Sequence, residues 1–189
     1  MSTNIEAGKV RLRNVRLAFA NLFVPKSFND DPALKPKYSC SFLIAKETKE
    51  GAETLATVKA AMKATYDYKW PKDGPKLKPN QICLRDGDDE SYEGFAGHMY
   101  LACSSERRPT IVDRDRSPLT EADDKVYSGC IVNATVRIWA QENDWGKRLN
   151  CSVEAVQFVS PGERVGAKAV NPLEEFDSLD GEAEADAPF

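Results

Sequence analysis

The longest regular pattern in this chain alternates small or apolar residues with larger polar ones between positions 126 and 140. The small or apolar set occupies the even positions, Val126, Ser128, Cys130, Val132, Ala134, Val136 and Ile138. A period of two residues is that of a β-strand with one buried face. We therefore expect the even positions to face a core and the odd positions, which include Arg137 and Trp139, to face away from it.

The first long apolar pattern, between residues 9 and 23, changes its phase partway along. Its apolar side chains form two sets of opposite parity, Val10 and Leu12 in the first and Val15, Leu17 and Phe19 in the second. A strand can keep both sets in one core only if an extra residue is inserted between them. The sequence therefore predicts a β-bulge or sharp bend near Arg13 and Asn14, as is common where a sheet curls into a small barrel.

Most of the remaining regular segments also have the period of a strand. Clear alternation occurs at residues 38–46 and 149–159, and shorter candidates lie at 81–85, 98–104 and 111–117. Only residues 48–69 have apolar residues at helical spacing, with acidic residues early and basic residues late, as the helix dipole favours. Five or six strands, one helix and long polar loops predict an all-β dominated fold, either a small barrel or a sandwich.

The C-terminal segment differs in composition from everything before it. Residues 174–189 contain seven acidic side chains and no basic one, and they end in Pro188 and Phe189. Like charges without apolar surface cannot form a core, so we expect a disordered, solvated tail. The terminal ring with its carboxylate suits docking into a basic pocket of a partner, for which we single out Asp186, Pro188 and Phe189. The alternative is a tail that only promotes solubility.

The residues that precede the acidic tail carry a small net positive charge. The whole chain has a formal net charge of −4, of which the tail contributes −7, so residues 1–173 carry +3. Such a body can attract a polyanion, and the tail can compete for the same surface. The predicted organisation is a disordered lead at 1–8, one domain at 9–166 and a disordered acidic tail at 167–189.

The residue types needed for catalysis are sparse. His98 is the only histidine, no glycine-rich phosphate loop is present, and the five cysteines have no Cys-x-x-Cys spacing. We therefore predict no enzyme activity, no metal and no cofactor. Acidic residues at 86–90 are interpreted as an exposed turn. The alternative is a metal-dependent nuclease or recombination enzyme that uses Asp86, Asp88 and Asp113. Without a signal peptide or membrane span, we expect reduced thiols and a cytoplasmic protein.

Basic and aromatic residues are interleaved along the predicted strands and loops. Single-stranded nucleic acids are held by aromatic faces that stack on bases and by Lys or Arg groups that contact phosphates. The leading candidates are Arg137 and Trp139, because an exposed Trp on the polar side of a strand needs a reason to be there. The full set of predicted DNA-binding residues is Arg11, Arg13, Arg16, Lys37, Tyr38, Trp70, Lys72, Tyr100, Arg107, Arg108, Tyr127, Arg137, Trp139, Lys147 and Arg148.

Several short motifs in the same order resemble a family of phage-encoded single-stranded DNA-binding proteins. They are Leu84-Arg85-Asp86-Gly87-Asp88, Arg108-Pro109-Thr110-Ile111-Val112-Asp113, Val126-Tyr127-Ser128-Gly129-Cys130, Val156-Gln157-Phe158 and Gly162-Glu163-Arg164. The resemblance implies an OB-fold, a five-stranded barrel here carrying long loops, that coats single-stranded DNA. The ending at Phe189 is similar to the acidic Pro-Phe tails of bacterial single-stranded DNA-binding proteins, which implies recruitment of replication and recombination proteins.

The sequence therefore predicts a non-catalytic, sequence-independent single-stranded DNA-binding protein that acts in phage DNA replication and recombination. Its tail would recruit partners and compete with DNA, and its location would be the cytoplasm of the host. A homo-oligomeric state is compatible with this reading. Besides the nuclease, the remaining alternative is an interaction adaptor that docks through its tail and does not bind DNA.

Overall fold

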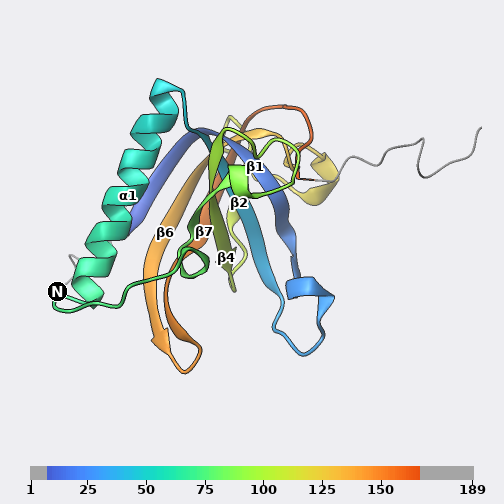
Figure 1. Ribbon diagram of the computed structural model, residues 1–189. Coiled ribbons are helices and arrows are strands. Elements are labelled where there is room, and N and C mark those ends of the chain that lie inside the picture. Colours follow the sequence, from blue (N-terminus) through green and yellow to red (C-terminus); the bar gives the residue numbers. More distant parts are fainter. Residues whose placement is uncertain (1–7, 167–189) are drawn as a thin grey trace, which may run out of the picture.

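The computed structural model describes residues 8–166 and consists of one long helix and seven strands in a single sheet (Figure 1). The predictions for residues 1–7 and for the acidic tail, with Asp186, Pro188 and Phe189, lie outside these residues. The elements are β1 (Lys9–Lys26), β2 (Lys37–Ala45), α1 (Lys49–Lys69), β3 (Leu84–Asp86), β4 (His98–Ser105), β5 (Thr110–Val112), β6 (Ile131–Asn143) and β7 (Gly146–Ser160).

The strand order β3-β4-β2-β1-β6-β7-β5 corrects the prediction of a five-stranded barrel. The sheet has seven strands and its ladders do not close into a barrel. The two additional strands, β3 and β5, have three residues each and form the two edges of the sheet. The short candidates at residues 81–85 and 111–117 overlap these two strands, so the sequence located them but not their place at the edges of the sheet. Among residues 8–166, no helix is long and apolar enough to span a membrane.

The predicted irregularity in the first strand is confirmed. The register between β1 and β6 shifts between Leu12 and Val15, and Asn14 has a left-handed backbone with φ 51°. The backbone N–H of Asn14 donates to Oδ1 of Asn133 at 3.0 Å, which fixes the bulge to strand β6. Val10, Leu12, Val15 and Leu17 thereby reach one core, whereas Phe19 packs against Phe95 on the other face of the sheet. Asn is among the few residues that adopt this conformation readily.

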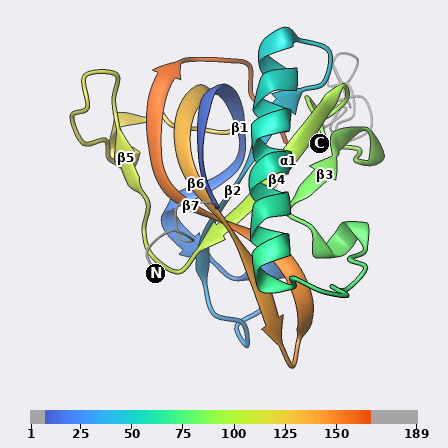
Figure 2. The same ribbon diagram turned by 90° about the vertical axis from the view of Figure 1, so that its left-hand side faces the viewer.

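Helix α1 covers the core side of β1, β2 and β6 (Figures 1 and 2). It begins after Thr48, whose hydroxyl accepts a hydrogen bond from the Gly51 N–H at 3.0 Å. The side of the helix that faces the sheet carries Leu55, Val58 and Ala61, all buried in the main core. The helical spacing of apolar residues in 48–69 therefore predicted both helix α1 and the side of it that packs on the sheet.

A second, smaller core lies on the other face of the sheet. It is formed by Ala18 of β1, Leu43 of β2 and Tyr100 of β4, together with Phe95 and Val165 from connecting segments. The ring of Phe95 packs against the ring of Tyr100 with centroids 5.2 Å apart. This packing gives the loop between β3 and β4 a structural role, because it covers outward-facing side chains that would otherwise be exposed.

Candidate nucleic-acid interface

The edge of β7 that faces β4 lies beside a groove of about 360 Å³, here called the seam groove. A single parallel bridge between Ile82 and Leu149 connects the two sides of this seam, instead of a continuous ladder. The groove is lined by Phe28, Asn80, Gln81, Ile82, Cys83, Arg85, Ala102, Cys103, Ser104, Arg148, Leu149, Asn150 and Cys151. Burial raises the pKa of the Cys83 thiol to about 12, so this thiol is uncharged at neutral pH.

The β1–β2 connection and the β6–β7 hairpin project from the same end of the sheet (Figures 1 and 2). The connection between β1 and β2 carries Phe28, whose side chain is 75% exposed and also lines the groove. The hairpin between β6 and β7 carries Trp145, which is 86% exposed. Rings exposed to this degree on projecting loops are open to contact with a ligand or partner. Together the two loops offer ring faces for base stacking.

Two arginines give the seam groove a positive lining. Arg148 donates from Nη1 to the backbone carbonyl of Asn80 at 3.4 Å, and Arg85 donates from Nε to the carbonyl of Ile82 at 3.1 Å. Within residues 8–166, neither guanidinium forms an ion pair. Because backbone carbonyls position the two groups without neutralising them, both retain full charge for a phosphate.

The base of the β1–β2 connection gathers several of the basic residues predicted from the sequence. Lys37 is the register partner of Lys26, and Tyr38 lies opposite Ser105. The Arg108 guanidinium sits 5.8 Å from the centroid of the Phe23 ring. Arg107 is exposed beside it. Tyr38 and Ser105 lie next to Ser104, which lines the seam groove, so this basic cluster is close to the groove.

Arg137 and Trp139 lie on the outward face of β6, as the alternation predicted. Arg137 forms an ion pair with Glu154 of β7, with Nε 2.7 Å from Oε1. Trp139 is 42% exposed, and its indole N–H donates to the Ser152 hydroxyl at 3.0 Å. This hydrogen bond fixes the ring against strand β7 while leaving much of its surface open to a ligand.

Three aromatic rings that were predicted to contact DNA are buried or covered by other side chains in this structure. Trp70 is buried and donates from its indole N–H to Glu142 at 2.7 Å. Tyr100 is buried and donates to Glu90 at 2.7 Å; burial and this carboxylate raise its pKa to about 12. Tyr127 donates its hydroxyl to the carbonyl of Gly162, and the Arg164 guanidinium covers its ring. The burial of Trp70 and Tyr100, and the guanidinium over the Tyr127 ring, make these three rings poor stacking surfaces for a base.

The remaining predicted lysines lie at the edges of the surface. Lys147 forms an ion pair with Glu142 at 3.3 Å in the β6–β7 hairpin. Lys72 is exposed in the loop after α1 and lies outside the seam groove. Phe28 and Arg85, which the sequence reading did not select, both line that groove. Phe28 stands in a loop without an alternating pattern, so no local signal distinguished it from a buried ring.

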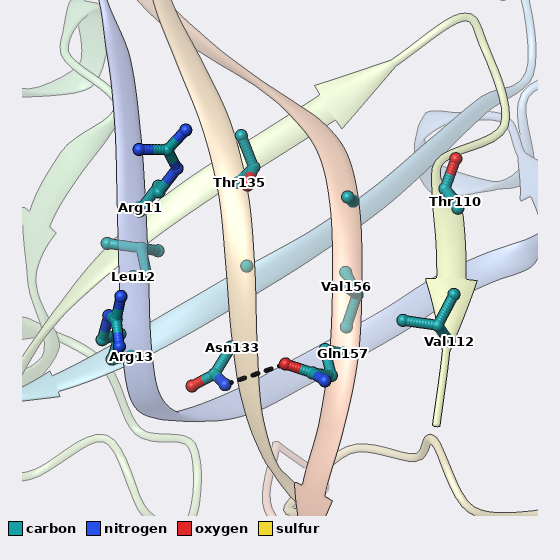
Figure 3. A pocket seen from close by; sticks show the side chains of 11 residues that line it. Arg11, Leu12, Arg13, Thr110, Val112, Asn133, Thr135, Val156 and Gln157 are labelled. Atoms are coloured by element: carbon teal, nitrogen blue, oxygen red, sulfur yellow. Dashed lines mark hydrogen bonds between the residues drawn. The ribbon is translucent and has the colours of Figure 1, made fainter. Parts of the chain in front are cut away.

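A second groove, of about 260 Å³, lies on the outward face of β1, β6, β7 and β5 and is here called the arginine groove (Figure 3). Arg11 and Arg13 line it from β1, and both are exposed. Arg16 is half-buried and belongs to the same outward set, because the bulge after Arg13 shifts the parity of the strand. The predicted arginines of the first strand are therefore on one face, but outside the seam groove.

The acidic residues of the nuclease alternative are neutralised by lysines at separate places. Lys46 of the loop after β2 forms ion pairs with both Asp86 and Asp88, and these contacts lower the pKa of each carboxyl. Asp113 is paired with Lys125, which likewise lowers its pKa. In the part of the chain that the structure describes, no three His, Cys, Asp or Glu residues are grouped to hold a metal. The carboxylates therefore fit a structural role.

Comparisons with known proteins agree with this geometry. Residues 8–187 match the family described as Enterobacter phage Enc34, ssDNA-binding protein. A putative protein, p50, of Acyrthosiphon pisum secondary endosymbiont phage 1 is 41% identical over 178 residues, which cover 90% of this chain and 94% of that protein. These matches confirm the resemblance found in the sequence motifs.

Solved structures share the fold. The single-stranded DNA-binding protein from bacteriophage Enc34 in complex with ssDNA superposes with a TM-score of 0.73 at 25% identity, covering 84% of this chain and 90% of that one. The gp2.5 single-stranded DNA-binding protein of bacteriophage T7 has a TM-score of 0.55 at 12% identity, covering 90% and 97%. Because the family match spans nearly the whole chain, this protein belongs to the family of the Enterobacter phage Enc34 single-stranded DNA-binding protein.

Proposed function

We propose that this chain binds single-stranded DNA without sequence preference during phage DNA replication and recombination in the host cytoplasm, with the seam groove as its main site. The observation that carries the proposal is the pair of exposed rings, Phe28 and Trp145, on loops that flank a groove containing two arginines without ion pairs. Aromatic faces and positive groups in one groove are what a single strand requires. Membership of the family supports the same ligand, and no catalytic role is proposed.

The sheet topology supports the assignment of the groove. We interpret β1, β2, β4, β6 and β7 as the five strands of an OB-fold, because β1 pairs with both β2 and β6, β2 with β4, and β6 with β7. An OB barrel would close between β4 and β7. Leu149 of β7 is bridged to Ile82, which precedes β3, and the neighbouring Cys83 carbonyl accepts from the N–H of Ala102 in β4. OB-folds bind oligonucleotides between the loops that follow their first and fourth strands. In this chain those loops carry Phe28 and Trp145.

In the proposed mechanism, aromatic rings contact bases and positively charged side chains contact phosphates. Rings at Phe28 and Trp145 would stack on bases, which tolerates any sequence because every base has an aromatic face. Arg85, Arg148 and the basic cluster around Arg108 would contact phosphates and release counterions. Stacking on base faces and contacts to phosphates do not depend on the identity of the base. Sequence-tolerant binding follows from this arrangement.

Salt dependence tests the electrostatic part of the proposal. The affinity for a thymidine oligomer should fall linearly on a log–log plot against salt, with a slope of about −0.7 for each phosphate neutralised. Arg148→Ala should reduce the magnitude of this slope by about 0.7. Fluorescence anisotropy of a labelled oligomer at several salt concentrations measures both quantities. Lys59→Ala, which removes one exposed charge from α1, should leave the slope unchanged.

A wild-type protein that shows no binding at low salt would contradict the proposed function. An unchanged slope in Arg148→Ala would instead remove Arg148 from the interface. The urea midpoint of each variant should equal that of the wild type, because both side chains make at most a weak surface contact.

We further propose that the acidic tail weakens DNA binding by competing for the positive grooves. Deleting residues 174–189 removes seven acidic side chains and should tighten binding, most strongly at low salt, where charges are least screened. The measurement is the same titration on intact and shortened protein. Unchanged or weaker binding after the deletion would leave Asp186, Pro188 and Phe189 as candidates for partner recruitment only.

A further inference from the structure

The seam groove and the arginine groove are connected by the outward face of the β6–β7 pair. Starting at the hairpin, the facing positions of the two strands run from Gln141 opposite Arg148, through Trp139 opposite Asn150, to Thr135 opposite Ala155. Arg148 and Asn150 line the seam groove, whereas Thr135 and Ala155 line the arginine groove. The two cavities thus lie at opposite ends of one strip of sheet surface.

The free positive groups of the arginine groove are Arg11 and Arg13. Within residues 8–166, neither guanidinium has a hydrogen-bond or ion-pair partner, and both side chains are exposed. The bulge at Asn14 follows directly, so the pair stands at the point where β1 bends away. Residues two apart on a strand lie about 6.8 Å from each other along it, so the two groups form a short row of charge.

The polar groups between the strands of this groove are already occupied. Nδ2 of Asn133 donates to Oε1 of Gln157 at 3.1 Å (Figure 3). Oδ1 of Asn133 accepts from the bulge N–H of Asn14. Nε2 of Gln157 donates to the carbonyl of Arg114 at 3.2 Å. With the amides satisfied, guanidinium groups are the main free donors. This chemistry suits the phosphates of a polynucleotide backbone rather than the edges of particular bases.

The strip between the two grooves is suited to a strand that crosses it. Arg137 is paired with Glu154, so the middle of the strip carries no net charge from this pair. Next to it, the ring of Trp139 is 42% exposed and held by Ser152. A base can stack on this ring while the flanking phosphates reach arginines on either side.

We infer that a single strand of DNA bound in the seam groove continues across Trp139 and along β6–β7 to the arginine groove, where Arg11 and Arg13 hold its phosphates. This inference rests on the proposed function. The eight steps from residue 133 to residue 141 of β6 span about 27 Å at the rise of an antiparallel strand. Long oligomers would therefore contact groups that short oligomers cannot reach.

The test compares the Arg11→Ala/Arg13→Ala double variant with wild type on thymidine oligomers of increasing length. Short oligomers should bind both proteins equally, because they fill only the seam groove. On long oligomers the variant should bind more weakly, and the magnitude of its salt slope should be smaller by about 1.4, which corresponds to two phosphates. Lys49→Ala/Lys59→Ala removes the same charge from the exposed face of α1 and should match wild type at every length.

The outcomes separate the inference from the function on which it rests. If the arginine variant and the control variant bind long oligomers equally, the extended path is wrong. It is also wrong if the arginine variant loses the same affinity on the shortest and the longest oligomers. Wild-type protein that binds no oligomer of any length would overturn the proposed function itself. The Arg11→Lys/Arg13→Lys variant keeps the charge and should retain most of the wild-type salt slope.

Discussion

The Phe28→Ala/Trp145→Ala double variant is expected to bind a thymidine oligomer far more weakly than wild type while keeping its fold. Each stacked ring contributes about 1–3 kcal/mol to single-strand binding, so the loss for two rings is at least about 30-fold. Both side chains are mostly exposed, at 75% and 86%, so their removal should leave the core intact. Fluorescence anisotropy with a labelled oligomer measures the affinity, and the urea midpoint verifies the fold.

Tyr68 offers a matched control for this experiment. Its ring is 68% exposed but lies on α1, outside the residues that line the seam groove. Tyr68→Ala should therefore bind with wild-type affinity. If the double variant also bound normally, the two loops would not provide the stacking surface, and the main site would have to lie elsewhere. Single variants at Phe28 and Trp145 then show whether one ring contributes most of the effect.

The second large effect expected is a loss of stability in Gly129→Ala. Gly129 has φ 120°, and an added Cβ would lie 2.0 Å from the backbone carbonyl oxygen of Glu163. A non-glycine residue in such a conformation costs about 1–3 kcal/mol, and forcing an atom into a packed site costs about 1–3 kcal/mol more. The free energy of unfolding should fall by about 2–6 kcal/mol, as measured by urea denaturation.

The surroundings of Gly129 explain why the backbone cannot move aside. Its N–H donates to the carbonyl of Leu17 at 2.7 Å, which holds the segment onto β1. The Tyr127 hydroxyl donates to the carbonyl of Gly162 at 2.8 Å and accepts from its N–H at 3.0 Å. The segment that includes Glu163 is thus clamped against residues 127–129. A shift that relieves the clash would break these hydrogen bonds.

Gly146→Ala is a control that separates the cost of the backbone conformation from the cost of the steric clash. Its φ of 108° is similar, but an added Cβ would meet no atom within 4 Å. Gly146→Ala should therefore lose only the conformational part, about 1–3 kcal/mol. Equal losses in the two variants would mean that the close approach to Glu163 does not contribute to stability.

The contacts around Gly129 also indicate the role of the motif Tyr127-Ser128-Gly129-Cys130. The alternation predicted a strand that starts at Val126. In the structure β6 starts at Ile131, so this segment precedes the strand. The Ser128 hydroxyl accepts from the N–H of Ala20, and Gly129 binds Leu17, so both contacts tie the segment to β1. The motif that helped to identify the family therefore serves the fold in this structure. The segment is joined to β1 by single hydrogen bonds and not by a continuous strand ladder.

The sequence by itself determined the local features of this protein. The period of two residues predicted the long strands, the phase change at Arg13 and Asn14 predicted the bulge, and the helical period of residues 48–69 predicted α1. These predictions succeeded because the parity of side chains along a strand, or their spacing along a helix, depends only on neighbouring residues. The set of family motifs likewise needed only the order of residues along the chain.

Only the tertiary structure decided which rings and charges face a ligand. Tyr100 points outward from β4 but is covered by Phe95 from the loop between β3 and β4, whereas Phe28 lies in an irregular loop and remains 75% exposed. Nothing in the local sequence distinguishes these two rings, because burial depends on which distant segment packs over each one. The same holds for the seam groove, whose sides come from residues 28, 80–83, 85, 102–104 and 148–151. A binding surface built from distant segments is a property of the fold, and no local pattern encodes it.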